Sequence, residues 1–111
     1  MATETRAVLF TSRPSAGVLT DAYTVASATQ VVVSTLAIIN TSTTTADTAQ
    51  ITVAPSGAVD TAAHTLVPTV DIAAKSMVTM TIGITLGATD KIRVKSTNGT
   101  VNFHGYGVTI A

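Results

Sequence analysis

The stretch from residue 76 to residue 110 constrains the fold most, because its apolar and polar side chains alternate with a period of two. Residues 78–85 place Val, Met and Ile at every second position, with Thr and Gly between them. This alternation is typical of a β-strand that buries one face. Two more strands are predicted over 91–95 and 101–108, joined at Asn98-Gly99, a strong signal for a type I′ β-hairpin. The stretch therefore predicts an antiparallel sheet.

The preceding residues predict further short strands, separated by turn-forming residues. These segments are 5–11, 22–25, 29–40, 49–54, 64–67 and 69–72. Segment 29–40 is apolar on both faces, so we expect it to be covered by an opposing sheet and by a neighbouring subunit. No long segment has a helical period. The pattern indicates an all-β fold, a single antiparallel β-sandwich of about eight strands, either a jelly roll or an Ig-like domain.

A break at Pro14 and Gly17 separates the first strand from the rest of the chain. We therefore divide the sequence into residues 1–14, an N-terminal strand, and residues 15–111, the β-sandwich domain. The N-terminal strand has two alternative placements. It either packs on the body of the domain or extends as a docking arm to a neighbouring molecule.

Charged residues make up only 11% of the chain and the net charge is zero, whereas a typical domain is about 25% charged. A weakly charged surface rich in Thr and Ala suits a protein that packs against neighbours. It does not suit nucleic-acid binding, which normally needs a basic patch. The one cationic cluster, Lys91, Arg93 and Lys95, is interpreted as the solvated face of an edge strand.

No catalytic or metal-binding pattern is present, so we expect no enzymatic activity, no cofactor and no metal site. The chain has no Cys, and its two imidazoles, His64 and His104, lack nearby carboxylates in a ligand pattern. No nucleophile elbow or phosphate-binding loop is found. The first ten residues lack a basic region followed by a long apolar run, so we expect no signal peptide, and no apolar run is long enough for a membrane span. We expect a soluble protein, synthesised in the cytoplasm and without a membrane partner.

The segment Gly105-Tyr106-Gly107 leaves one aromatic ring with little side chain around it. Two interpretations remain. The glycines mark a position where another backbone approaches closely, or Tyr106 is a stacking platform for a sugar. In the second case Asn102, His104 and Tyr106, which alternate along one strand, would form the exposed contact face.

Three segments together resemble small virion structural proteins of tailed bacteriophages. They are YTVASATQVVVSTLAIINTSTTTADTAQITVAPSG, ITLGATDKIRV and VNFHGYGVTI, and the likeness spans about residues 23–110. It is carried by an extended entry into a long apolar strand that ends in Asn-Thr-Ser, a Pro-Ser-Gly turn and a glycine-containing last strand. Residues 86–94 and 103–108 are also similar to the end of trimeric jelly-roll domains, with Thr89-Asp90 where those domains have Gly-Asp.

The resemblance implies a β-sandwich that decorates a capsid or forms part of a tail, often as a symmetric oligomer. Our leading hypothesis is a capsid decoration (cement) protein of the outer shell, a homotrimer that bridges subunits of the major capsid protein. The N-terminal stretch 2–14 would be the docking arm. Its expected contact residues are Val8, Leu9, Phe10, Arg13 and Pro14. Two alternatives remain: a tail or baseplate component, and a host-glycan-binding module that uses the contact face of Asn102, His104 and Tyr106.

Overall fold

The computed structural model describes residues 3–58 and 62–111 and confirms the all-β prediction. Within these residues it contains eight strands and two short 3-10 turns, Pro55–Gly57 and Ala62–His64. The strands are β1 (Glu4–Ser12), β2 (Thr20–Thr24), β3 (Gln30–Asn40), β4 (Asp47–Ala54), β5 (Thr65–Ile72), β6 (Met77–Leu86), β7 (Lys91–Ser96) and β8 (Val101–Ile110).

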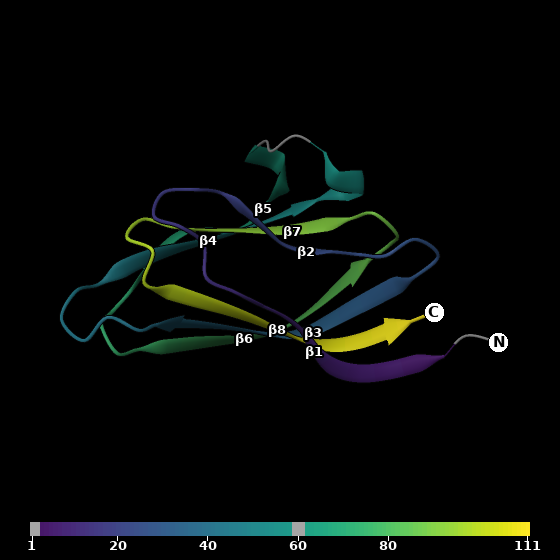
Figure 1. Ribbon diagram of the computed structural model, residues 1–111, viewed down its shortest axis with the longest axis horizontal. Helices are drawn as coiled ribbons and strands as arrows, with labels where there is room; N and C mark the ends of the chain where they lie inside the picture. The colour runs from purple at the N-terminus through teal and green to yellow at the C-terminus, as the bar shows by residue number, and fades with distance from the viewer. Residues whose placement is uncertain (1–2, 59–61) are drawn as a thin grey trace.

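The strands form two antiparallel sheets that face each other (Figure 1). Sheet A has the order β1-β8-β3-β6, and sheet B has the order β2-β7-β4-β5. Only β4 and β5 are neighbours both in sequence and in a sheet, so almost every connection crosses from one sheet to the other. This is the strand order of an eight-stranded jelly roll. An Ig-like domain would instead pair its first two strands.

The core lies between the two sheets and consists of alternate residues from each strand. The largest fully buried side chains include Phe103, Leu36 and Ile38 from sheet A. Ile51, Ile92 and Val94 of sheet B pack into the same cluster. Burial of apolar surface stabilises the fold by about 25 cal/mol per Å², which explains why a period of two dominates the sequence.

The predicted hairpin at Asn98-Gly99 is wrong. β7 belongs to sheet B and β8 to sheet A, so the 97–100 turn crosses between the sheets. Gly99 has a positive φ of 76° but Asn98 does not, whereas a type I′ turn requires positive φ at both positions. The carboxylate of Asp47 holds the turn, since it accepts hydrogen bonds from the backbone N–H of Asn98 (2.9 Å) and of Thr100 (3.0 Å).

The interpretation of Lys91, Arg93 and Lys95 as an edge-strand face is also wrong. Their strand, β7, lies between β2 and β4 in the middle of sheet B. Asp21 on the edge strand β2 pairs with Lys91 (2.9 Å) and with Arg93 (2.8 Å). The two cations therefore fasten an edge strand to its neighbour instead of repelling other molecules.

The N-terminal strand packs on the body of the sandwich. β1 pairs with β8 along its length and forms one edge of sheet A. Beyond the strand pair, Thr3 and Ala111 exchange two backbone hydrogen bonds, of 2.8 and 3.0 Å. The described parts of the two chain ends thus lie side by side at one corner of the molecule (Figure 1).

Candidate functional site

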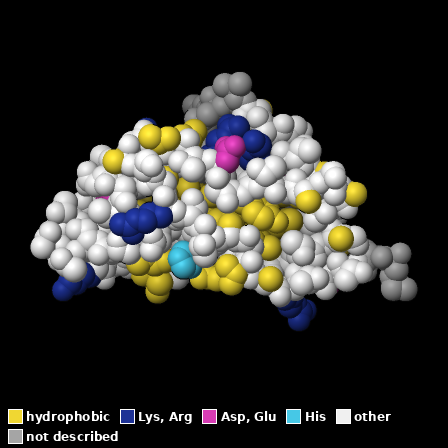
Figure 2. All heavy atoms as spheres, viewed as in Figure 1, with side chains coloured by type: hydrophobic (Ala, Val, Ile, Leu, Met, Phe, Trp, Pro, Cys, Tyr) yellow, Lys and Arg dark blue, Asp and Glu magenta, His cyan; other side chains and the backbone are white. Residues whose placement is uncertain are grey.

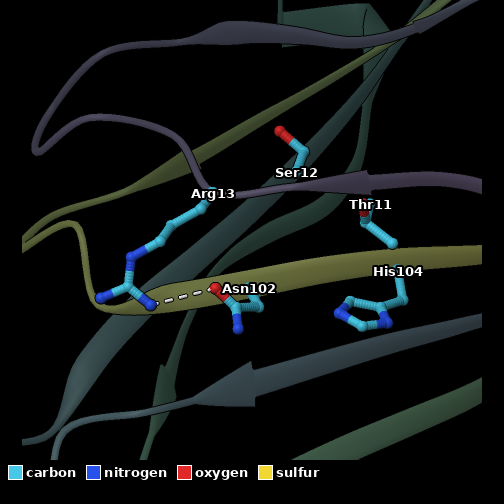
Figure 3. Close-up of a pocket in the computed structure, with 5 residues that line it drawn as sticks. All are labelled: Thr11, Ser12, Arg13, Asn102 and His104. Carbon is cyan, nitrogen blue, oxygen red and sulfur yellow. Dashed lines mark hydrogen bonds between the residues drawn. The ribbon is translucent and has the colours of Figure 1, made fainter.

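An open recess of about 310 Å³ lies where β1 ends beside β8. Five residues line it: Thr11, Ser12, Arg13, Asn102 and His104. Figure 3 shows Arg13 reaching across from the end of β1 to Asn102 on β8, with His104 further along the same strand. The structure therefore brings Thr11, Ser12 and Arg13 of the expected docking arm together with Asn102 and His104 of the expected contact face.

Arg13 is held in place by two hydrogen bonds from its guanidinium group. Nη1 donates to Thr41 Oγ1 (2.9 Å) and to Asn102 Oδ1 (3.0 Å). The second bond orients the Asn102 amide, so that its Nδ2 is left to donate elsewhere. Among the residues that the structure describes, Arg13 makes no ion pair. The recess therefore offers a positioned cation and an amide donor.

Tyr106 lies beside the recess on β8, in contact with His104. His104 Nδ1 lies 3.0 Å from the Tyr106 hydroxyl, and the two rings are 6.1 Å apart between centroids. Asn102, His104 and Tyr106 are alternate residues on one strand and all are half-buried, so they share the outer face of sheet A. The predicted contact face is thus a continuous row of side chains.

The two glycines beside Tyr106 are explained by close approach, as one of the two interpretations held. A Cβ on Gly107 would collide with the backbone carbonyl of Val32, and a Cβ on Gly105 would collide with the ring of Phe10. Gly107 therefore lets β8 lie close to β3, and Gly105 makes room in the core. Tyr106 keeps its outward position between them.

The five expected interface residues separate into exposed and buried groups. Val8 is 57% exposed, and Arg13 is exposed as well. Phe10 is only 7% exposed and stacks on Tyr23 with centroids 5.8 Å apart. A β-bulge between Val8 and Phe10 changes the alternation of β1 and turns Phe10 into the core. The expectation that Phe10 contacts a partner is therefore wrong.

The remaining two residues of that set, Leu9 and Pro14, make little surface available. Leu9 is half-buried and packs against the core, and Pro14 is buried. Of the five expected contact residues, Val8 and Arg13 are therefore the ones exposed to another molecule. Both belong to the side of the molecule on which β8 carries His104 and Tyr106.

The outer face of sheet A carries almost no charge. Of the residues in its four strands, only Glu4 and Arg6, at one end of β1, are charged. Exposed Val8 and Met77 and half-buried Val32, Ile39 and Val108 supply apolar surface. Figure 2 shows hydrophobic side chains along the lower side of the molecule, where sheet A lies, with Lys or Arg side chains near the two ends of that side. An acidic side chain lies beside cationic side chains on the upper side.

Charged groups are concentrated in sheet B, where they make structural contacts. Hydrogen bonds from Lys91 and Arg93 hold the pKa of Asp21 below its usual value. Arg93 also donates from Nη1 to the carbonyl of Ala58 (2.6 Å) and from Nη2 to that of Gly57 (3.2 Å). Arg93 therefore uses its guanidinium N–H donors for contacts within the chain.

Two further findings concern metal binding and membranes. In the ranges 3–58 and 62–111, no group of three or more His, Cys, Asp or Glu residues is placed to hold a metal ion. No helix in those ranges is long and apolar enough to cross a membrane. His64 ends the short Ala62–His64 turn and takes no part in the recess described above.

Comparisons of the chain with models of protein families, with curated proteins and with solved structures find no match. Its function is therefore inferred from the chemistry of its own surfaces.

Sequence reasoning identified Arg13, Asn102 and His104 separately. It missed the shared recess, and it missed the charge-poor face of sheet A. The signal for that face was present in the sequence, since segments 30–40, 77–86 and 101–110 contain no Asp, Glu, Lys or Arg.

Proposed function

We propose that this protein is a virion structural protein of a tailed bacteriophage, a capsid decoration protein that binds the outer shell and bridges its subunits. The observation that carries the proposal is the outer face of sheet A, a broad surface of apolar and Thr side chains. The charges of its strands are confined to Glu4 and Arg6 at one corner, and Arg13 lies at its rim. Contiguous apolar surface on a small domain marks an interaction site. The jelly-roll fold supports the proposal, because viral capsid proteins use it, although lectins and cupins do too.

The proposed partners are a second and third copy of this chain, forming a homotrimer, and the major capsid protein of the shell. Val8 is the exposed large hydrophobic side chain of the N-terminal strand and would make the shell contact, and Arg13 provides a further, polar contact. Burying apolar side chains of this face would supply the binding free energy. Its lack of charges would spare the complex most of the cost of desolvating ions.

Such a protein would stabilise the shell by mass action. A ligand that binds only the assembled shell lowers its free energy by RT ln(1 + [L]/Kd) per site, or about 2.7 kcal/mol when the free protein is at roughly 100 times its Kd. Bridging adds to this effect, because one decoration protein then opposes the separation of two shell subunits. No catalysis is required of the protein.

The test is co-sedimentation of the purified protein with expanded empty capsids and, in parallel, with purified tails. The variant Val8→Lys places a charge on the proposed contact face and should reduce capsid occupancy. The matched control is Val18→Lys, because Val18 is 52% exposed but lies in the connection between β1 and β2. This control should bind capsids like the wild type.

Binding to capsids that Val8→Lys weakens and Val18→Lys does not would support decoration. Binding to tails alone would replace it with a tail or baseplate role. Binding to neither particle would remove the virion proposal for this surface.

A second candidate function, host-glycan binding, is favoured by the recess between β1 and β8. Its cation, its amide donor and the adjacent Tyr106 ring suit a saccharide that carries a carboxylate. A glycan array with wild type, Arg13→Gln and Tyr106→Ala tests this function. Binding of acidic glycans that either substitution weakens would support it, and an array on which the wild type binds nothing would eliminate it.

A further inference from the structure

Each sheet of the sandwich has two edge strands, and edge strands need protection because their free N–H and C=O groups can pair with another chain. Three of the four carry familiar protection. β1 has Glu4, Arg6 and a bulge; β2 is short and has Asp21; β5 has Pro68, Asp71 and register shifts. Charges, proline, bulges and short length all discourage pairing between edges.

The fourth edge strand, β6, lacks most of this protection. It spans ten residues from Met77 to Leu86, contains neither charge nor proline, and pairs only with β3 among the described residues. Its pairing with β3 shifts register opposite Ser34, but its own side chains keep alternating between exposed and more buried positions from Met80 to Leu86. Met77 is 62% exposed, the highest value among the large hydrophobic residues. β6 is therefore a long and uncharged open edge, whose protection is limited to the register shift at Ile82 and Gly83.

Gly83 lies at the register shift between β3 and β6, where Ile82 and Gly83 face the single residue Ser34. Glycine weakens the interior of a strand, and it usually marks a bulge or a close approach of another backbone. Within this chain, however, a Cβ on Gly83 would meet nothing within 4 Å, and Gly83 does not have a positive φ. The register shift accounts for a glycine in the strand interior, and the empty space beside Gly83 leaves the β6 backbone open to a second chain at that point.

We propose that two copies of this chain pair through β6, strand to strand and antiparallel, about a two-fold axis at Thr81. The exposed residues of β6 run from Met77 to Thr85, and Thr81 is their midpoint. Because the axis passes through a residue, each core-facing side chain of one β6 lies opposite a core-facing side chain of the other β6. Met80 then lies opposite Ile82 of the other copy, Val78 opposite Ile84, and Thr79 opposite Gly83.

The strand is self-complementary in this arrangement. Antiparallel pairing over residues 77–85 would form about ten backbone hydrogen bonds, the number found in a typical protein–protein interface. The opposed pairs are apolar on the core side and Thr or Gly, with Met77, on the outer side, and no like charges meet. The two copies of sheet A would become one eight-stranded sheet. A two-fold, isologous contact is also the commonest in homo-oligomers.

This contact is independent of the proposed virion function, and it differs from a three-fold contact. A trimer cannot be closed by a strand that pairs with itself, because each β6 is used once per pair. If the trimer also forms, the β6 contact would join two trimers. Oligomer mass therefore separates the two inferences, since β6 pairing predicts dimers or hexamers.

The test is the mass of the purified full chain by sedimentation equilibrium or mass photometry, for wild type and for Thr81→Lys and Thr81→Glu separately. Each variant places two like charges opposite each other at the axis and should raise the dissociation constant roughly tenfold or more. An equimolar mixture of the two variants should recover association, because Lys then faces Glu. The control is Thr5→Lys, which charges an exposed position on the β1 edge.

Hydrogen exchange adds a second measurement. The β6 amides that point away from β3 should be protected in the wild type and should exchange rapidly in Thr81→Lys, while the β8 amides stay protected in both. Even-numbered oligomers that the single variants dissociate and the mixture restores would establish the contact. A monomer at high micromolar concentration, a trimer that loses its mass in Thr81→Lys, or an oligomer that Thr81→Lys leaves intact would each overturn it.

Discussion

Asp47 shows how one residue can determine a connection between sheets. Its buried carboxylate accepts hydrogen bonds from Ser96 Oγ (2.8 Å), from Thr100 Oγ1 (2.8 Å) and from three backbone N–H groups. Burial raises the pKa of Asp47, but these hydrogen bonds outweigh burial and hold the pKa well below its usual range. A sequence pattern of strands and turns contains no sign of this role.

We predict that Asp47→Asn destabilises the fold by about 2 to 3 kcal/mol, because the neutral amide cannot accept all the donors aimed at it. The stabilisation from Asp47 should be complete above about pH 5 and should be lost as the pH falls through the depressed folded-state pKa. Urea unfolding of wild type and variant between pH 2 and pH 7 measures both effects. The loss of stability in acid should be smaller in the variant, and a parallel loss in both proteins would contradict the prediction.

Phe10 gives a second prediction at this scale. Its ring fills the space above Gly105 and stacks on Tyr23, so Phe10→Ala should cost about 3 to 5 kcal/mol of unfolding free energy. The neighbouring Val8→Ala should cost far less, because Val8 is exposed. Thermal or urea denaturation compares the two variants. Equal losses would show that the ring is not part of the core.

At the scale of elements, the strands were predictable but their partners were not. The period of two located β6, β7, β8 and β3 within a few residues, because burial of one face is a local property of a strand. Which strands pair depends on long-range packing. Asn98-Gly99 suggested that β7 pairs with β8, but the donors on both sides of Gly99 bind Asp47, and the turn leads into the other sheet.

The candidate site was predictable in part for the same reason. Alternation along β8 was enough to place Asn102, His104 and Tyr106 on one face. Bringing Arg13 to them required the pairing of β1 with β8, two strands at opposite ends of the sequence. The bulge that buries Phe10 also escaped the sequence, because nothing in Ala-Val-Leu-Phe distinguishes a regular strand from a bulged one.

Arg93 links three elements, and its replacement gives a prediction at this scale. The guanidinium group pairs with Asp21 on β2 and donates to the carbonyls of Gly57 and Ala58. A Lys at this position keeps the charge but cannot reach all three acceptors at once. Arg93→Lys should therefore cost about 1 to 2 kcal/mol. It should speed hydrogen exchange in β2 more than in β3, and uniform exchange across both sheets would contradict this account.

For the whole molecule, the pairing of β1 with β8 means that the first and last strands of the domain meet. Domains with such long-range pairing fold slowly, in milliseconds to seconds. We predict that a circular permutant folds to the same structure when a short Gly/Ser linker joins the adjacent ends and new termini are made in the exposed 43–45 loop. Far-UV circular dichroism and an unchanged amide exchange pattern would confirm it. A permutant that aggregates would contradict it, provided that the linked but uncut chain folds.

The mutual hydrogen bonds of Thr3 and Ala111 also determine how the molecule responds to force. Tension applied between these two residues would open the β1–β8 pair like a zipper, one hydrogen bond after another, starting at the shared corner. Tension applied across a pair of β6 strands, along their length, would load all the bonds between them together. The molecule would then be mechanically soft between its own ends and stiff along the seam between two copies.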